Sequence, residues 1–118
     1  MQQLLVMKFG GTSMGSAERM RVAAEICTEQ ARQRPVAIVV SAMSKVTDLL
    51  LDTLKKAEGE DRAALIANLQ ALEERHTQCC MELLPAGKRE PVLEGIRTTI
   101  ADFQRIAQGV MMLGGRPP

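Results

Sequence analysis

The chain has 118 residues, of which 46% are hydrophobic and 2% aromatic, a length close to one domain and sufficient to bury a core. Its 15 lysines and arginines nearly balance 14 aspartates and glutamates, so charge gives no reason to expect nucleic acid or an anionic membrane as a partner. No signal peptide and no apolar run of about 20 residues is recognisable. The three cysteines, Cys27, Cys79 and Cys80, are expected to be reduced thiols. We therefore expect a soluble cytoplasmic protein.

Two short apolar runs on either side of a helical segment predict a strand, helix and strand at the start of the chain. Residues 3–9 and 36–40 are typical of strands that are buried on both faces of a parallel sheet. Residues 17–33 form the crossover helix, which Ser16 caps and Pro35 ends. The loops after both strands then lie at the same edge of the sheet, where ligands bind in open α/β folds.

The rest of the chain is predicted to be helical. One helix starts near Ser44 and breaks at Gly59, and Asp61 caps a longer one with a heptad-like apolar seam. After Pro85, a further helix carries Pro91 in its first turn, and residues 61–113 should pair as an antiparallel helical hairpin. The longer helix's seam consists of Leu65, Leu69, Leu72, His76, Cys79 and Leu83. We interpret His76 as locally hydrogen-bonded and both seam-region cysteines as packed thiols.

The segment from Val6 to Ser13, VMKFGGTS, suits an anion and most plausibly a phosphate. Gly10 and Gly11 have no Cβ, so the backbone can adopt strained dihedral angles and bring its N–H groups to a bound oxyanion. Lys8 adds a positive charge, but it precedes the glycines, so the Walker A pattern is absent. The alternative is a structural turn with a solvated lysine at the strand end.

A second motif, Val39 to Leu50 or VVSAMSKVTDLL, follows the second predicted strand. It places Ser41 before and Thr47 within the start of a helix. Hydroxyl groups at these positions can bind a ligand, or they can cap the free N–H groups of the helix. The residues alone leave both interpretations open.

The two motifs, in this order and at this separation, closely resemble those of aspartokinases in the amino acid kinase superfamily. The resemblance is specific over the first 50 residues and rests on helical character beyond them. It implies an α/β, carbamate kinase-like, three-layer αβα fold with parallel strands. In this family the two residues after the methionine are often small and commonly glycines, whereas Ser44 and Lys45 stand here, which suggests a stiffer turn and an extra cation near an acidic substrate.

The resemblance also assigns roles to individual residues. Lys8 would be catalytic and contact the transferring phosphoryl group. Ser41 and Thr47 would hold L-aspartate, and no metal-binding residue is assigned. The ATP phosphates would be bound by Lys8, Gly10, Gly11, Thr12 and Ser13.

The implied function is aspartate kinase, which uses ATP and Mg²⁺ to convert L-aspartate to 4-phospho-L-aspartate on the way to lysine, threonine and methionine. The family's later G-E-R-[LIM]-S-like motif is not found in residues 1–118. We therefore expect the amino-terminal portion of a kinase domain, inactive alone and prone to form homo-oligomers, with residues 1–58 as a βαβα phosphate and substrate unit before the 61–113 hairpin. The alternatives are an amino acid kinase with another acidic acceptor, or a non-enzymatic module whose hairpin binds a partner.

Overall fold

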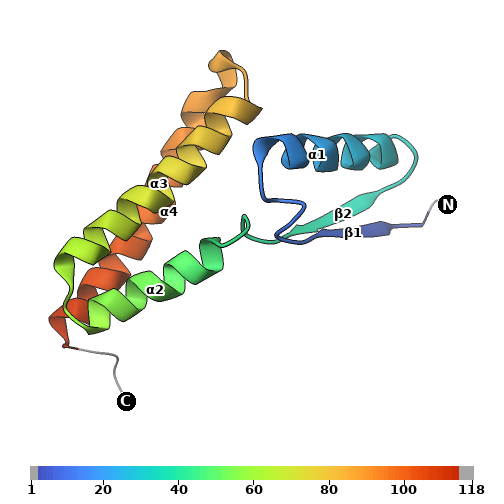
Figure 1. The fold of residues 1–118 in the computed structure, drawn as a ribbon. Coiled ribbons are helices and arrows are strands. Elements are labelled where there is room, and N and C mark those ends of the chain that lie inside the picture. The colour runs from blue at the N-terminus through green and yellow to red at the C-terminus, as the bar shows by residue number, and fades with distance from the viewer. Residues whose placement is uncertain (1–2, 115–118) are drawn as a thin grey trace. The chain divides into compact units, whose positions relative to one another are not determined.

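The structure is a computed structural model that describes residues 3–114. It forms two compact units, which divide between Lys45 and Val46. The sequence placed the boundary near residue 58, and the difference arises because α2 packs against both later helices. The elements are β1 (Leu5–Phe9), α1 (Ala17–Ala31), β2 (Val36–Val40), α2 (Val46–Glu58), α3 (Arg62–Leu83) and α4 (Ala86–Met112) (Figure 1).

The first unit is a βαβ arrangement. Strands β1 and β2 are parallel and pair in register from Leu5 with Val36 to Phe9 with Val40, as the sequence predicted. Beyond the paired residues, the backbone N–H of Ser41 donates to the carbonyl of Phe9 at 3.0 Å. The two strands therefore end side by side, so that the loops after them begin at the same edge of the sheet, and α1 connects the end of β1 to the start of β2 (Figure 1).

Neither face of this sheet is fully buried, which departs from the expectation that both would be buried. Phe9 lies beside α1 residues, and alternation along a strand places Lys8 on the opposite face. On that opposite face Val6 is 62% exposed and Val39 is 49% exposed. On the face of Phe9, Ile38 is 48% and Val40 is 57% exposed, so α1, the helix of the first unit, leaves apolar side chains exposed on both faces.

The second unit is a bundle of three helices. Helices α3 and α4 are joined by Leu84 and Pro85 alone and lie side by side as an antiparallel pair (Figure 1), which confirms the predicted hairpin. Asp61 caps α3, because its Oδ1 accepts a hydrogen bond from the N–H of Ala64 at 3.1 Å. The core combines small and long side chains, namely Ala57, Leu65, Leu69, Ala107 and Met111.

Helix α4 begins earlier than the sequence suggested. It starts at Ala86, so Gly87 lies in its first turn and Pro91 lies inside the helix. The early start is stabilised by Arg89, whose guanidinium donates to the carbonyls of Leu84 and Met81, each at 2.8 Å. These bonds tie the beginning of α4 to the carbonyls at the end of α3, which lack helical partners.

Every helix between residues 3 and 114 is too short or too polar to cross a bilayer.

Candidate functional site

The loop between β1 and α1 is held by its own backbone and by the first turn of the helix. The N–H of Met14 donates to the carbonyl of Gly10 at 3.1 Å, and that of Gly15 donates to Thr12 at 3.2 Å. Ser16 caps α1 by accepting from the N–H of Arg19 at 3.2 Å. The Arg19 guanidinium donates back to the Thr12 carbonyl at 3.0 Å, so the loop and the helix start fix each other.

The glycines of the loop matter for the space they leave beside the backbone and not for a strained backbone conformation. Neither Gly10 nor Gly11 has a positive φ, so the expected strained dihedral angles are not observed. A Cβ on Gly10 would meet no atom within 4 Å, whereas one on Gly15 would lie 3.2 Å from the Thr12 carbonyl oxygen. Gly10 therefore borders open space that a ligand can enter. Of the three glycines in this loop, Gly15 has the least room for a side chain. The sequence analysis did not identify it, although its position directly before the Ser16 cap indicated a tight turn.

The loop after β2 lies against the glycine loop. A Cβ on Gly11 would stand 3.7 Å from the carbonyl oxygen of Ala42 and 3.8 Å from both Ser41 Oγ and Ser44 Cα. Met43 anchors this second loop because its side chain is buried. The structure thus brings the two sequence motifs together at the carboxyl edge of the sheet, as their order along the chain predicted.

The hydroxyl residues of the two motifs are placed differently from one another. Ser13 lines a cavity on the α1 side of the sheet together with Ser16, whereas Thr12 is exposed. Ser41 is exposed and donates its hydroxyl hydrogen to the carbonyl of Ala42 at 2.9 Å. Thr47 is exposed in the first turn of α2, in the second unit.

The capping alternative for Ser41 and Thr47 is not what the structure shows. The Ser41 hydroxyl bonds a loop carbonyl rather than a helix N–H. The Thr47 hydroxyl makes no hydrogen bond with the described residues, 3–114. Both hydroxyl groups are therefore accessible to a ligand.

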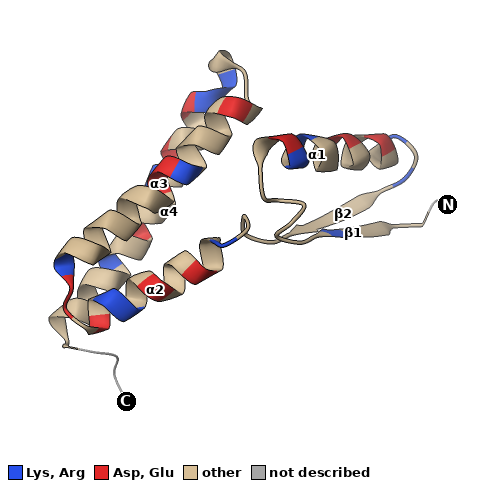
Figure 2. Ribbon diagram, in the orientation of Figure 1, with Lys and Arg blue, Asp and Glu red and all other residues tan. Residues whose placement is uncertain are grey.

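The edge that carries the two loops is cationic. Lys8 and Lys45 are exposed, and neither side-chain ammonium group makes an ion pair or hydrogen bond with residues 3–114. The acidic residues of the first unit, Glu18, Glu25 and Glu29, all lie on α1, and the two loops carry none (Figure 2). Nothing acidic within these loops competes for the lysines, so the edge favours an anion.

Lys45 adopts a left-handed backbone conformation with a φ of 69°. This conformation costs a residue with a Cβ about 1–2 kcal/mol, whereas glycine adopts it freely. The geometry explains why a small residue suits this position of the motif. Lys45 and Glu60 are the two non-glycine residues with positive φ in the described part of the chain.

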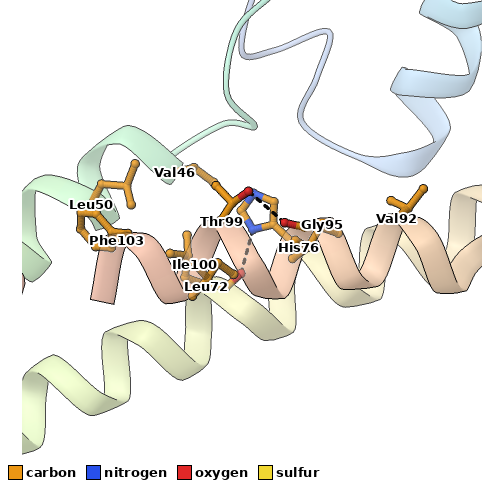
Figure 3. Close-up of a pocket in the computed structure, with 10 residues that line it drawn as sticks. Val46, Leu50, Leu72, His76, Val92, Gly95, Thr99, Ile100 and Phe103 are labelled. Atoms are coloured by element: carbon orange, nitrogen blue, oxygen red, sulfur yellow. Dashed lines mark hydrogen bonds between the residues drawn. The ribbon is translucent and has the colours of Figure 1, made fainter. Parts of the chain in front are cut away.

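A second concave surface lies wholly in the second unit. This groove, of about 590 Å³, is lined by apolar side chains of α2, α3 and α4 together with His76 and Thr99 (Figure 3). His76 Nδ1 lies 2.7 Å from the carbonyl oxygen of Leu72, and Thr99 donates to the carbonyl of Gly95 at 2.9 Å. The local hydrogen bond of His76 is confirmed, and no Lys, Arg, Asp or Glu lines the groove.

The cysteines and acidic residues offer no reactive or metal site in the described residues. Burial raises the pKa of the Cys79 thiol above its ordinary 9.0, and the nearby Glu82 carboxylate raises it further. A raised pKa keeps the thiol protonated, which agrees with a packed residue rather than a nucleophile. Between residues 3 and 114 no three His, Cys, Asp or Glu side chains gather as metal ligands would.

Comparison with known proteins gives consistent matches. The model of the amino acid kinase family matches residues 3–111. An aspartokinase of Chlamydia trachomatis is 38% identical over 104 residues, which cover 88% of this chain and 20% of that protein. Two chloroplastic proteins of Arabidopsis thaliana each match over 92% of this chain. Aspartokinase 1 is 36% identical over 18% of its length, and the bifunctional aspartokinase/homoserine dehydrogenase 2 is 34% identical over 12% of its length. The chain thus spans between about an eighth and a fifth of these relatives.

Proposed function

The chain belongs to the amino acid kinase family, and on this premise we propose that it works as part of an aspartate kinase. The reaction transfers the γ-phosphate of ATP to the side-chain carboxylate of L-aspartate and gives ADP and 4-phospho-L-aspartate, the first step toward lysine, threonine and methionine. The observation that carries the proposal is the cationic edge, where the glycine loop and the Ser41 loop lie against each other. The aspartokinase relatives support the choice of acceptor.

In the proposed reaction, the aspartate carboxylate attacks the γ-phosphorus in line while the bond to the β-phosphate oxygen breaks. Such a transfer needs positioning and charge neutralisation more than covalent chemistry. The exposed Lys8 ammonium would stabilise charge on the transferring phosphoryl group. The open space beside Gly10 admits phosphate oxygens, where Gly11, Thr12 and Ser13 would complete the contacts.

The aspartate would be held by Ser41 and Thr47. Both hydroxyl groups are exposed, and neither caps a helix. Mg²⁺ is part of the proposal as the usual companion of ATP, but the described residues offer no acidic cluster for it. We therefore assign it no ligand in this chain and no step of the mechanism. The three-layer fold and the cytoplasmic location remain predictions.

The first experiment measures the role of Lys8 in the full-length enzyme. Lys8→Ala should lower kcat by orders of magnitude, because the lost charge acts mainly on the transition state. The melting temperature should stay unchanged, since the Lys8 side chain is exposed and makes no ion pair or hydrogen bond with residues 3–114 that the substitution would remove. Lys55→Ala, at an exposed position of α2, is the matched control and should keep full activity. Normal turnover by the Lys8→Ala enzyme would contradict the assignment of Lys8 as the catalytic residue.

A second experiment separates the two substrates. Ser41→Ala or Thr47→Ala should raise KM for aspartate more than KM for ATP. An effect confined to KM for ATP would assign these residues to the nucleotide site.

The alternative of an amino acid kinase with a different acidic acceptor is tested by replacing aspartate with glutamate or another acidic acceptor. The alternative of a non-enzymatic hairpin module is disfavoured because the family match includes the glycine loop as well as the hairpin.

The isolated 118 residues are expected to lack kinase activity, because the chain spans a fifth or less of these aspartokinase relatives. They are also expected to self-associate through the exposed apolar side chains of the sheet, which include Val6 and Val39. A coupled ADP assay measures the first property, and light scattering at micromolar concentration measures the second. Measurable turnover would contradict the first expectation, and a strictly monomeric chain would contradict the second.

A further inference from the structure

The carbonyl of Thr12, in the middle of the glycine loop, accepts hydrogen bonds from two directions. The Arg19 guanidinium donates to it at 3.0 Å, and the backbone N–H of Gly15 donates to it at 3.2 Å. The backbone N–H of Arg19 also donates to Ser16 Oγ at 3.2 Å. Arg19 is therefore tied by its backbone to the cap of α1 and by its side chain to the loop before that cap.

The bond from Arg19 sets the direction of the next N–H group in the loop. The peptide bond between Thr12 and Ser13 is trans, because the described residues contain no cis peptide bond. In a planar trans peptide, the C=O and the N–H point in opposite directions. Since the Thr12 carbonyl points toward the guanidinium, the N–H of Ser13 points away from it.

The N–H groups of Gly11, Thr12 and Ser13 are unpaired donors. None of them donates to another residue between 3 and 114, and all three residues are exposed or half-buried. Successive unpaired N–H groups of this kind suit an anion. A carbonyl oxygen that turned in among them would repel the anion, and a hydrogen bond from a charged guanidinium, one of the stronger kinds, opposes that turn.

We propose that Arg19 is a positioning residue for ATP, which holds the Thr12 carbonyl away from the phosphates so that the N–H groups of the glycine loop face them. The inference rests on the proposed kinase function. In this role Arg19 acts through Thr12 and does not contact the nucleotide. Arg19 also lines the same cavity as Ser13, so the experiment has to separate positioning from direct contact.

The test uses the full-length enzyme and begins with wild-type turnover of ATP and aspartate, whose absence would refute the proposed function itself. With turnover established, Arg19→Met removes the guanidinium but keeps the backbone N–H that donates to Ser16. It should raise KM for ATP about tenfold, through the loss of one hydrogen bond from a charged group. Both kcat and KM for aspartate should change less than about threefold.

Two further variants separate this role from a general loss of stability. Arg19→Lys keeps a charged donor that can make a single hydrogen bond, and its KM for ATP should stay within about threefold of wild type. Arg32→Met removes an exposed ion pair with Glu29 in the same unit and should leave both KM values unchanged. The melting temperature of Arg19→Met should fall no further than that of Arg32→Met.

Gly15→Ala acts on the same carbonyl from its other side. A Cβ on Gly15 would lie 3.2 Å from the Thr12 oxygen, so the carbonyl has to shift, and KM for ATP should rise by about threefold or more. In the double variant with Arg19→Met, the rise should be smaller than the product of the two single rises, because both changes displace one group.

Three outcomes would overturn the proposal while leaving the kinase function standing. The first is an unchanged KM for ATP in Arg19→Met or in Gly15→Ala. The second is an equal rise in both KM values in Arg19→Met, which would indicate a general disturbance of the fold. The third is a double variant whose rise equals the full product, which would assign Arg19 a separate contact with the nucleotide.

Discussion

The two units of this chain divide stability and chemistry between them. In the second unit, buried side chains from three helices form a continuous cluster that includes Ala57 and Leu69. In the first unit the buried hydrophobic side chains among the described residues are few, namely Met14, Ala17, Ala23 and Met43, and both faces of the sheet carry exposed apolar side chains. Yet the first unit carries the glycine loop and both unoccupied lysines of the candidate site. The accessible polar groups of the candidate site thus lie in the unit with fewer buried side chains, because a ligand must be able to reach them.

The largest expected effect breaks the packing of the second unit. Leu69→Ala removes a side chain that is 8% exposed and belongs to the core cluster. It should lower the free energy of unfolding by about 2–5 kcal/mol, through lost burial and a residual cavity. Urea unfolding followed by far-ultraviolet circular dichroism measures the change.

Two control substitutions make this comparison quantitative. Ile66→Ala truncates a 48% exposed residue of the same helix, and Val6→Ala truncates a 62% exposed residue of the first unit. Each should cost less than about 1 kcal/mol, because most of the removed surface is already in water. A Val6→Ala cost as large as that of Leu69→Ala would show that the exposed sheet face is covered in solution.

The connection between α3 and α4 gives the next effect. Arg89→Met removes two hydrogen bonds from a guanidinium to the carbonyls of Leu84 and Met81 and should cost about 1–2 kcal/mol. Arg97→Met, which loses only an exposed ion pair with Glu90 at 3.4 Å, should cost less than about 0.5 kcal/mol. Equal losses in the two variants would mean that Arg89 does not stabilise the helix ends.

The sequence allowed the elements to be predicted wherever a local signal was strong. The apolar runs located both strands, and the side chains of Ser16 and Asp61 marked two helix starts that the structure confirms. The placement of Pro91 inside α4 was missed, because the compensating bonds of Arg89 depend on tertiary contacts. The exposure of Val6 and Val39 was missed for a similar reason: an apolar run indicates a strand but does not show which elements cover it.

The candidate site was predicted in part. The order of the two motifs predicted that their loops would share one edge of the sheet, since the carboxyl ends of parallel strands do so. The left-handed conformation of Lys45 could not be predicted from its residue type, because lysine has no preference for positive φ. The hydrogen bond from Arg19 to the Thr12 carbonyl could not be predicted either, because it spans a loop whose shape the sequence did not specify.

A smaller effect concerns the two non-glycine residues with positive φ among the described residues, Lys45 and Glu60. Lys45→Gly and Glu60→Gly replace residues with φ of 69° and 55°, and each should raise the free energy of unfolding by up to about 1 kcal/mol. Lys55→Gly, inside α2, should instead lower it by about 1 kcal/mol. Thermal unfolding distinguishes these signs, and destabilisation by Lys45→Gly would argue that the loop is not strained there.

The smallest effect is a pH dependence in the second unit. Asp52 accepts a hydrogen bond from the Asn68 amide at 2.9 Å, and this bond, together with the positive charge of Lys56, holds the pKa of Asp52 below its ordinary 3.8. A lowered pKa means that the contact between α2 and α3 contributes stability above the ordinary pKa, and that this contribution is lost as the pH falls through the lowered value. Between about pH 5 and pH 2, wild type should therefore lose more stability than Asn68→Ala does. In an Asp52→Asn background, where nothing titrates at this position, Asn68→Ala should leave the pH slope unchanged, and an equal flattening in both backgrounds would assign the slope to another carboxylate.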